Sequence, residues 1–151
     1  MVEQVPDLEQ IKQLKYRYVR LLDTKDWDGF SECFTEDATG DYAGLVFANR
    51  SDLVDYMRTN LPAGILTMHQ VHHPEITVSG DEATGRWYLQ DKVLSDAFRF
   101  ALEGAAFYED RYTRTPTGWR IAHTGYIRTF ETTYSLDDLP SLKISGYSPT
   151  P

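Results

Sequence analysis

The spacing of the hydrophobic residues changes once along this chain of 151 residues, close to Gly64. Before that point apolar side chains recur every three or four residues, which is typical of helices, and after it they alternate with polar ones, which is typical of strands. Helices first, followed by long strands joined by tight turns, predict an α+β fold. We expect the helices to cover one face of a curved sheet of antiparallel or mixed strands.

Three helices are expected in the first part of the chain. Asp7 follows a proline and is suited to cap a helix, which its apolar spacing extends to about Thr24. Residues 25–29 read as a break before a short second helix. That helix is expected to present Trp27, Phe30 and Phe34. Ser51 is suited to cap a third helix over residues 52–60, which a Leu-Pro pair ends.

Strand-like segments occupy the second part. The first includes residues 76–78 and stops at a Ser-Gly-Asp turn signal, and the second alternates over residues 83–95. Two longer runs, 98–115 and 119–134, are separated by a Thr-Pro-Thr-Gly turn. We expect one domain over residues 1–151, in which residues 135–151 form an extended tail or cover a neighbouring subunit.

Composition excludes several classes of protein. The 41% of hydrophobic and 13% of aromatic residues fit a globular protein rather than a disordered one. The net charge of −8 argues against nucleic acid or an anionic membrane as a partner. No secretory signal pattern and no apolar run of about 18 residues is visible, so a cytoplasmic location is expected. The single cysteine, Cys33, is expected to be a buried structural thiol.

One carboxylate stands on an apolar strand face. In the strand 83–95, alternation places Asp91 with Trp87, Leu89 and Val93. A carboxylate on such a face is costly to bury unless it is hydrogen-bonded or ion-paired. Asp91 therefore either satisfies a buried donor or lines a functional site, and the strand alone does not decide between the two.

Three histidines lie close together in the chain. Alternation places His69 and His73 on one strand face and His72 on the other. No HExxH motif and no second group of ligands accompanies them, so we expect no metal and no cofactor. An imidazole that faces a cavity as a general base is the more plausible interpretation, because its ordinary pKa is near neutrality.

Tyr18, Asp23 and Arg128 stay ambiguous on spacing alone. Tyr18 lies on the apolar face of the first helix, where a core tyrosine is the alternative to a functional one. Asp23 lies about 140° around that helix from Tyr18, so the two converge only if the helix end bends inward. Arg128 is in phase with Tyr126 and Phe130 and either pairs with Asp91, holds a substrate oxygen, or is simply exposed.

Five segments together carry a resemblance to a known family. They are KYRYVRLLD (15–23), MH (68–69), PEIT (74–77), TGRWYLQD (84–91) and TGYIR (124–128). From about Leu8 to Tyr134 the chain resembles the SnoaL-like branch of the nuclear-transport-factor-2-like superfamily. It looks most like the bile-acid 7α-dehydratases and, more distantly, like scytalone dehydratase. His73 departs from the small polar residue expected there, and the tail after Tyr134 matches nothing in the pattern.

The resemblance implies a cone-shaped α+β barrel with an apolar pocket, commonly a trimer, and chemistry without a cofactor. It implies catalytic roles for five residues, which are Tyr18, Asp23, His69, Asp91 and Arg128. It also implies that a hydrophobic substrate contacts Tyr42, Trp87, Phe107 and Tyr126. A dimer is the alternative assembly.

The activity implied by this resemblance is a hydro-lyase that removes water from a polycyclic or steroid-like hydroxy-ketone. His69 would be the base, oriented by Asp23, and Tyr18, with Tyr42, would donate to the developing oxyanion. Asp91 with Arg128 would hold the site geometry, or Asp91 would assist proton transfer. A ketosteroid-isomerase-like or polyketide-cyclase-like enzyme is one alternative. A non-catalytic ligand-binding module is the other, and it predicts that His69 and Asp23 are not within hydrogen-bond reach.

Overall fold

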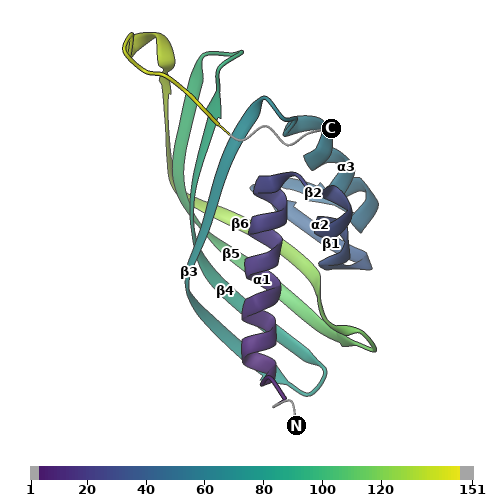
Figure 1. Cartoon of the computed structure of the whole chain (residues 1–151). Coiled ribbons are helices and arrows are strands. Elements are labelled where there is room, and N and C mark those ends of the chain that lie inside the picture. The colour runs from purple at the N-terminus through teal and green to yellow at the C-terminus, as the bar shows by residue number, and fades with distance from the viewer. Residues whose placement is uncertain (1–3, 147–151) are drawn as a thin grey trace.

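The computed structural model of the protein describes residues 4–146, and it consists of helices packed on one face of a curved sheet (Figure 1). Three helices precede most of the sheet: α1 (Asp7–Thr24), α2 (Trp27–Glu32) and α3 (Arg50–Asn60). The α+β fold expected from the change in hydrophobic spacing is therefore confirmed. None of the helices in the described part has the length and apolar character that a membrane crossing requires.

The sheet has six strands and two free edges. The strands are β1 (Phe34–Tyr42), β2 (Leu45–Phe47), β3 (Ile65–Ser79), β4 (Glu82–Ser95), β5 (Phe100–Thr115) and β6 (Gly118–Ser135). Their spatial order is β2-β1-β6-β5-β4-β3, so β2 and β3 form the edges and the sheet is not closed into a barrel. All neighbours are antiparallel except β1 and β6, which makes the sheet mixed.

Strands β1 and β2 are absent from the elements expected from the sequence. Phe34 begins β1 instead of ending the short helix, and β1 runs on to Tyr42. The partner of β1 is β6, near the other end of the chain, and the pairing register shifts between Phe34 and Thr39. A parallel pair so distant in sequence leaves no hairpin signal.

Two helix starts differ from expectation. The first helix begins at Asp7 without a side-chain cap, because the Asp7 carboxylate binds residues of the sheet instead. The third helix begins at Arg50, and its N-cap is Asn49, whose side chain accepts a 2.9 Å hydrogen bond from the N–H of Asp52. Ser51 was thus the wrong choice of cap, and Asn49 satisfies the exposed N–H group that a cap must serve.

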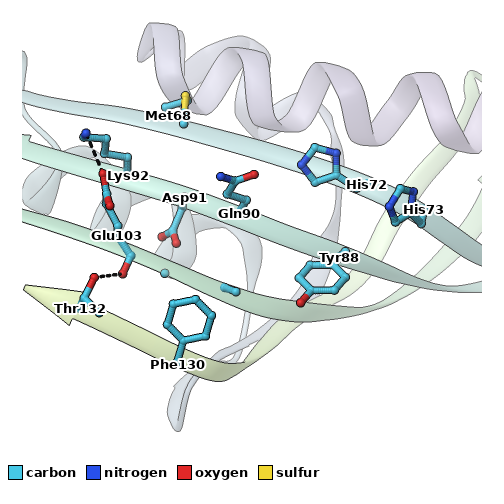
Figure 2. A pocket seen from close by; sticks show the side chains of 12 residues that line it. Met68, His72, His73, Tyr88, Gln90, Asp91, Lys92, Glu103, Phe130 and Thr132 are labelled. Atoms are coloured by element: carbon cyan, nitrogen blue, oxygen red, sulfur yellow. Dashed lines mark hydrogen bonds and ion pairs between the residues drawn. The ribbon is translucent and has the colours of Figure 1, made fainter.

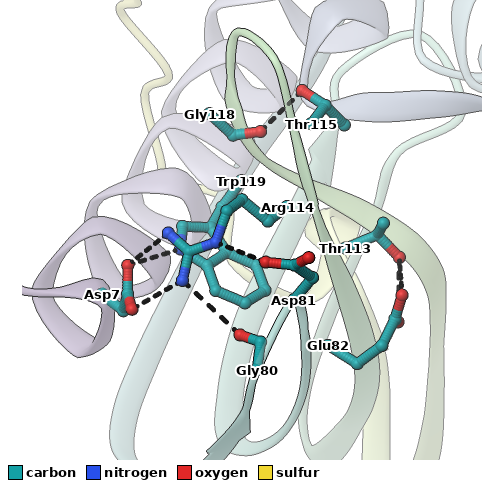
Figure 3. Close-up of polar contacts among 9 residues, drawn as sticks. All are labelled: Asp7, Gly80, Asp81, Glu82, Thr113, Arg114, Thr115, Gly118 and Trp119. Carbon is teal, nitrogen blue, oxygen red and sulfur yellow. Dashed lines mark hydrogen bonds and ion pairs between the residues drawn. The ribbon is translucent and has the colours of Figure 1, made fainter.

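Figure 3 shows how the start of α1 is fixed to the sheet. Both Asp7 oxygens accept hydrogen bonds from Arg114, each 2.7 Å long, and Oδ1 also accepts one from Trp119 Nε1 at 3.1 Å. Arg114 Nε donates to Asp81 in the β3–β4 turn. The hydrogen bonds from Arg114 and Trp119 hold the pKa of Asp7 at about 2. This cluster ties the first turn of α1 to two strand connections.

The core lies between α1 and the inner face of the sheet. Ile11, Leu14, Tyr18 and Leu22 of α1 are fully or almost fully buried. They pack in one cluster with aromatic and aliphatic residues of the strands, and each buried aliphatic side chain contributes about 1.5–3 kcal/mol relative to exposure. The helical spacing predicted from the sequence is thus the spacing of the buried residues.

Beyond β6 the chain forms a short 3₁₀ helix, η1 (Leu136–Asp138), and then an irregular segment. Leu136 is completely buried, and its N–H donates to the carbonyl of Arg99. Gly146 lies close to Leu66 of β3. The described part of the predicted tail therefore contacts its own chain, whereas residues 147–151 lie outside the described residues.

Candidate active site

A cavity of about 230 Å³ lies between the inner face of the sheet and helices α1 and α3. Its apolar lining consists of Leu22, Leu45, Met57, Leu61, Leu89 and Val93. Its polar lining consists of Tyr42, Tyr56, Thr67, His69, Asp91, Tyr108, Tyr126 and Arg128. An apolar enclosure with a few convergent polar groups is typical of a small-molecule site.

His69 and Asp23 form a directly hydrogen-bonded pair at the edge of this cavity. Asp23 lies in the last turn of α1, which ends where Lys25 adopts a left-handed conformation with φ of 59°. Its Oδ1 lies 2.6 Å from His69 Nδ1 and accepts a 2.8 Å hydrogen bond from Thr67, and its Oδ2 accepts one of 2.8 Å from the His69 N–H. A carboxylate only accepts, so Nδ1 carries the proton and Nε2 is left as the basic nitrogen.

Asp91 and Arg128 form a second pair on the same inner face. Asp91 is 5% exposed and accepts two hydrogen bonds from Arg128, of 2.5 Å from Nη1 and 2.8 Å from Nη2. Between them lies Gly104, where a Cβ atom would come within 2.5 Å of Arg128 Nη1. Glycine at this position therefore leaves the room in which the guanidinium reaches the carboxylate. The hydrogen bonds that Arg128 donates to Asp91 are the main cause of the raised pKa of this guanidinium.

A cluster of tyrosines forms the neighbouring wall. The hydroxyl oxygens of Tyr18 and Tyr42 are 2.6 Å apart, and the Tyr18 ring meets the Tyr108 ring edge-on with centroids 5.8 Å apart. Tyr42 and Tyr108 line the cavity, and the completely buried Tyr18 supports them. Burial raises the pKa of all three phenols, so they remain neutral hydrogen-bond donors at neutral pH.

The side chains of Tyr18 and Asp23 do not converge; they point to different strands. Tyr18 points toward β1 and β5, where it meets Tyr42 and Tyr108, whereas Asp23 reaches β3. Because the two residues lie about 140° apart around α1, each supports a different wall of the cavity. The five residues predicted to be catalytic are thus arranged as two hydrogen-bonded pairs and part of a tyrosine cluster. His69, Asp91 and Arg128 line the cavity, and Asp23 and Tyr18 contact residues that line it.

Two aromatic residues predicted to contact a substrate lie elsewhere. Trp87 is completely buried, donates to Tyr112 at 2.9 Å and packs on Tyr16 of α1. Phe107 faces the outer side of the sheet, because alternation turns it away from its neighbour Tyr108, and its ring packs at a tilt against that of Tyr88 with centroids 4.6 Å apart. Sequence reasoning missed Tyr108, and phase with Asp110 is the signal that could have found it. Tyr42 and Tyr126 do line the cavity.

The other histidines lie on the opposite face of the sheet. There His72 and His73 both border a hollow of about 480 Å³, with Tyr88, Gln90 and Phe130 (Figure 2). The expectation that His73 shares a face with His69 is wrong. The pairing of β3 with β4 shifts register between His72 and Glu75, and His73 has φ of 44°, so alternation is interrupted there.

A second irregularity separates Arg128 from Phe130. Ala106 pairs with Arg128 and Ala105 with Phe130, so Thr129 is an extra residue in β6. This bulge turns Arg128 inward and Phe130, which is 59% exposed, outward, against the common phase expected from the sequence.

Among residues 4–146, no three His, Cys, Asp or Glu side chains are grouped so as to hold a metal ion.

Sequence comparison identifies the family of this chain. The family model of the SnoaL-like domain matches residues 3–125. The chain belongs to the SnoaL-like domain family. It is thereby a member of the nuclear-transport-factor-2-like superfamily, as the sequence segments around Tyr18, His69 and Asp91 predicted.

This SnoaL-like protein is similar in sequence to one group of relatives and in fold to several solved structures. The uncharacterised protein Rv2910c of Mycobacterium tuberculosis is 28% identical over 133 residues, which cover 86% of this chain and 90% of the relative. A candidate scytalone dehydratase from Novosphingobium aromaticivorans has a TM-score of 0.78 at 19% identity, covering 84% of this chain and 87% of its own. A hexachlorocyclohexane dehydrochlorinase, LinA type 2, has a TM-score of 0.76 at 16% identity, covering 84% and 88%. At these identities the two solved structures support the fold alone.

Proposed function

We propose that this SnoaL-like protein is a hydro-lyase that removes water from a hydrophobic hydroxy-ketone without a cofactor. The observation that carries the proposal is the contact of 2.6 Å between His69 Nδ1 and Asp23 Oδ1 at the wall of an apolar cavity. A carboxylate that fixes the tautomer of an imidazole and stabilises its cation prepares the other ring nitrogen to act as a base. Two structural neighbours bear names that denote eliminations, a dehydratase and a dehydrochlorinase, which agrees with this class.

Elimination from a β-hydroxy ketone needs a base, an enolate stabiliser and a proton for the departing hydroxide. In the proposed mechanism His69 Nε2 removes the proton from the carbon next to the carbonyl and later returns it to the leaving hydroxyl. The hydroxyls of Tyr42 and Tyr108, backed by Tyr18, donate to the carbonyl oxygen as negative charge develops on it. Asp91, which Arg128 holds in place, keeps a fixed polar group beside His69.

The two alternatives receive less support. A non-catalytic binding module predicts that His69 and Asp23 are out of hydrogen-bond reach, and their contact of 2.6 Å argues against it. An isomerase of the ketosteroid type relies on a carboxylate base. Here the cavity carboxylate, Asp91, is occupied by two hydrogen bonds from Arg128, and Asp23 by three from β3. Neither carboxylate is free to act as that base.

Cavity volume limits the part of the substrate that reacts. Liquid water occupies about 30 Å³ per molecule, so 230 Å³ holds roughly eight non-hydrogen atoms, or about one ring. A polycyclic or steroid-like hydroxy-ketone therefore fits with its reacting ring inside and its other rings extending past Leu45, which is 41% exposed.

Mass spectrometry tests this proposal on a panel of cyclic β-hydroxy ketones with one to four rings. The expected result is a product lighter by one water for at least one member with the wild-type protein, and none with His69→Ala. For a panel member that also carries a carbon–carbon double bond, a product of unchanged mass in which that bond has moved would favour the isomerase. Undiminished turnover by a folded His69→Ala protein would contradict the assignment of the base.

Self-association is a further part of the proposal. Tyr88, Phe107 and Ile127 are cross-strand neighbours on the outer face of the sheet, and Ile127 is 69% exposed. An exposed apolar row of this kind supports the proposal that a second copy of the chain covers it. The resemblance implies a trimer, and a dimer is the alternative. Light scattering of Ile127→Lys is expected to give a smaller particle than the wild type, and an unchanged mass would exclude this face.

A further inference from the structure

A completely buried ion pair lies behind the tyrosine wall and has no role in the proposed mechanism. Lys15 of α1 and Asp110 of β5 have fully buried side chains, and Lys15 Nζ lies 2.8 Å from Asp110 Oδ2. Burial of two charges costs several kcal/mol, and replacement of such a pair by apolar residues is often neutral or stabilising. A structural role alone is therefore a weak account of this pair.

The surroundings of Asp110 are arranged to keep it an acceptor. Thr124 Oγ1 donates to Oδ1 at 2.7 Å, and Tyr112 donates to Oδ2 at 2.8 Å. Trp87 Nε1 in turn donates to the Tyr112 hydroxyl. Burial lowers the pKa of Lys15, and the adjacent carboxylate of Asp110 opposes that effect. The network thus supplies the negative partner that a buried ammonium needs.

The ammonium of Lys15 lies over two rings of the tyrosine cluster. Its Nζ is 3.5 Å from the centroid of Tyr108 and 4.0 Å from that of Tyr18. The spacing within each element produces this arrangement, since Lys15 and Tyr18 are one helical turn apart and Tyr108 and Asp110 point to the same face of β5. From these rings the cluster extends to Tyr42 and to the cavity.

We infer that Lys15 is a positioning residue that strengthens hydrogen-bond donation from Tyr18, Tyr42 and Tyr108 to an anionic oxygen in the cavity. A cation over a phenol ring stabilises the electron density that the ring gains as its O–H bond polarises. The ligand class is accordingly an enolate or a phenolate. This inference rests on the proposed function only in naming the enolate, because a stable phenolate probes the same donors without turnover.

The test uses 4-nitrophenol, a one-ring phenol whose neutral and ionised forms differ in visible absorbance. Its ionised fraction when bound is measured in the wild type and in Lys15→Met/Asp110→Asn, which removes both charges and leaves neither unpaired. We expect the ratio of ionised to neutral ligand at one pH to be about tenfold higher in the wild type. Tyr112→Phe is the matched control, since it disturbs the same buried network but keeps the ammonium and both rings.

An unchanged ratio in the folded double variant would overturn the inference, and so would an equal change in Tyr112→Phe. A wild-type protein that does not bind 4-nitrophenol would also overturn it, because the donors would then be inaccessible. If the double variant does not fold, ¹⁵N NMR of the wild-type lysine Nζ groups decides. A protonated, ring-shifted Lys15 signal at neutral pH supports the inference, and a neutral amine contradicts it. Absence of dehydration with any hydroxy-ketone would contradict the proposed function alone.

Discussion

His69 and Asp91 are direct partners across β3 and β4, and both side chains face the cavity. Each is held by a residue from a different element, His69 by Asp23 of α1 and Asp91 by Arg128 of β6. Directly opposite residues on one sheet face have Cβ atoms about 4.5–5.5 Å apart. The candidate base and the buried carboxylate are therefore neighbours whose orientations are fixed independently.

The first prediction concerns the cooperation of His69 and Asp23. His69→Gln and Asp23→Asn are each expected to lower kcat/KM roughly 10²–10⁴-fold, because either change removes the oriented base. The double variant should be no worse than the poorer single one, since the two residues act as a unit. Steady-state kinetics on an identified substrate provide the measurement. Additive losses would mean that Asp23 acts separately from His69.

A second prediction follows from the space at Gly104. Gly104→Ala places a methyl group 2.5 Å from the present position of Arg128 Nη1, so the guanidinium must move off Asp91. We expect a clear loss of activity in a protein that still folds. Gly64→Ala is the control, since its Cβ would meet no atom within 4 Å. Activity of Gly104→Ala equal to that of Gly64→Ala would show that the Asp91–Arg128 geometry is unimportant.

A third prediction concerns the energetics of that pair. Arg128→Met leaves the Asp91 carboxylate buried and unpaired, with an expected cost of about 3 kcal/mol in the free energy of unfolding. Adding Asp91→Asn should restore much of this stability, because the uncompensated charge is removed. Urea denaturation of the single and double variants measures both effects. A double variant as unstable as Arg128→Met would rule out the unpaired charge as the cause.

Acid should weaken the attachment of α1 to the sheet. The pKa of Asp7 is about 2 in the folded protein against an ordinary value of 3.8, so its contribution is complete above that ordinary value and is lost as the pH falls toward 2. Asp7→Asn is expected to have a lower Tm than the wild type at neutral pH, and the difference should shrink between about pH 4 and pH 2. Thermal unfolding across this range tests it, and a difference independent of pH would point to a cause other than ionisation.

The sequence was most informative where a residue and its neighbours in the chain decide the outcome. The spacing of Leu14, Tyr18 and Leu22 predicted α1 to its last residue, and the turn residues near Gly118 predicted the β5–β6 hairpin. It was least informative for β1, whose partner is β6. The sequence of residues 34–42 contains no local signal that predicts pairing with β6.

The site divides in the same way. Alternation identified Asp91 as a buried carboxylate, but no spacing could join Asp23 to His69, because the path of α1 across β3 sets that contact. The choice of Phe107 over Tyr108 failed for a local reason. Residues 105–108 are all apolar or aromatic, so their own alternation gives no phase, and only Asp110 and Tyr112 further along β5 indicate that Tyr108 faces inward. Bulges in β3 and β6 then altered the faces of His73 and Phe130.

The parallel pairing of β1 with β6 also governs when the cavity can exist during synthesis. Tyr42 lies beside Tyr126 in that pairing, so the tyrosine wall is complete only after β6 has left the ribosome. Contacts between segments so far apart in sequence slow folding, because a long loop must close before they form. Until then β1 has no partner strand in the nascent chain. The helices are also synthesised before most of the sheet on which they pack. Ligand binding is thus a property of the finished chain, and the last strand is the one that creates it.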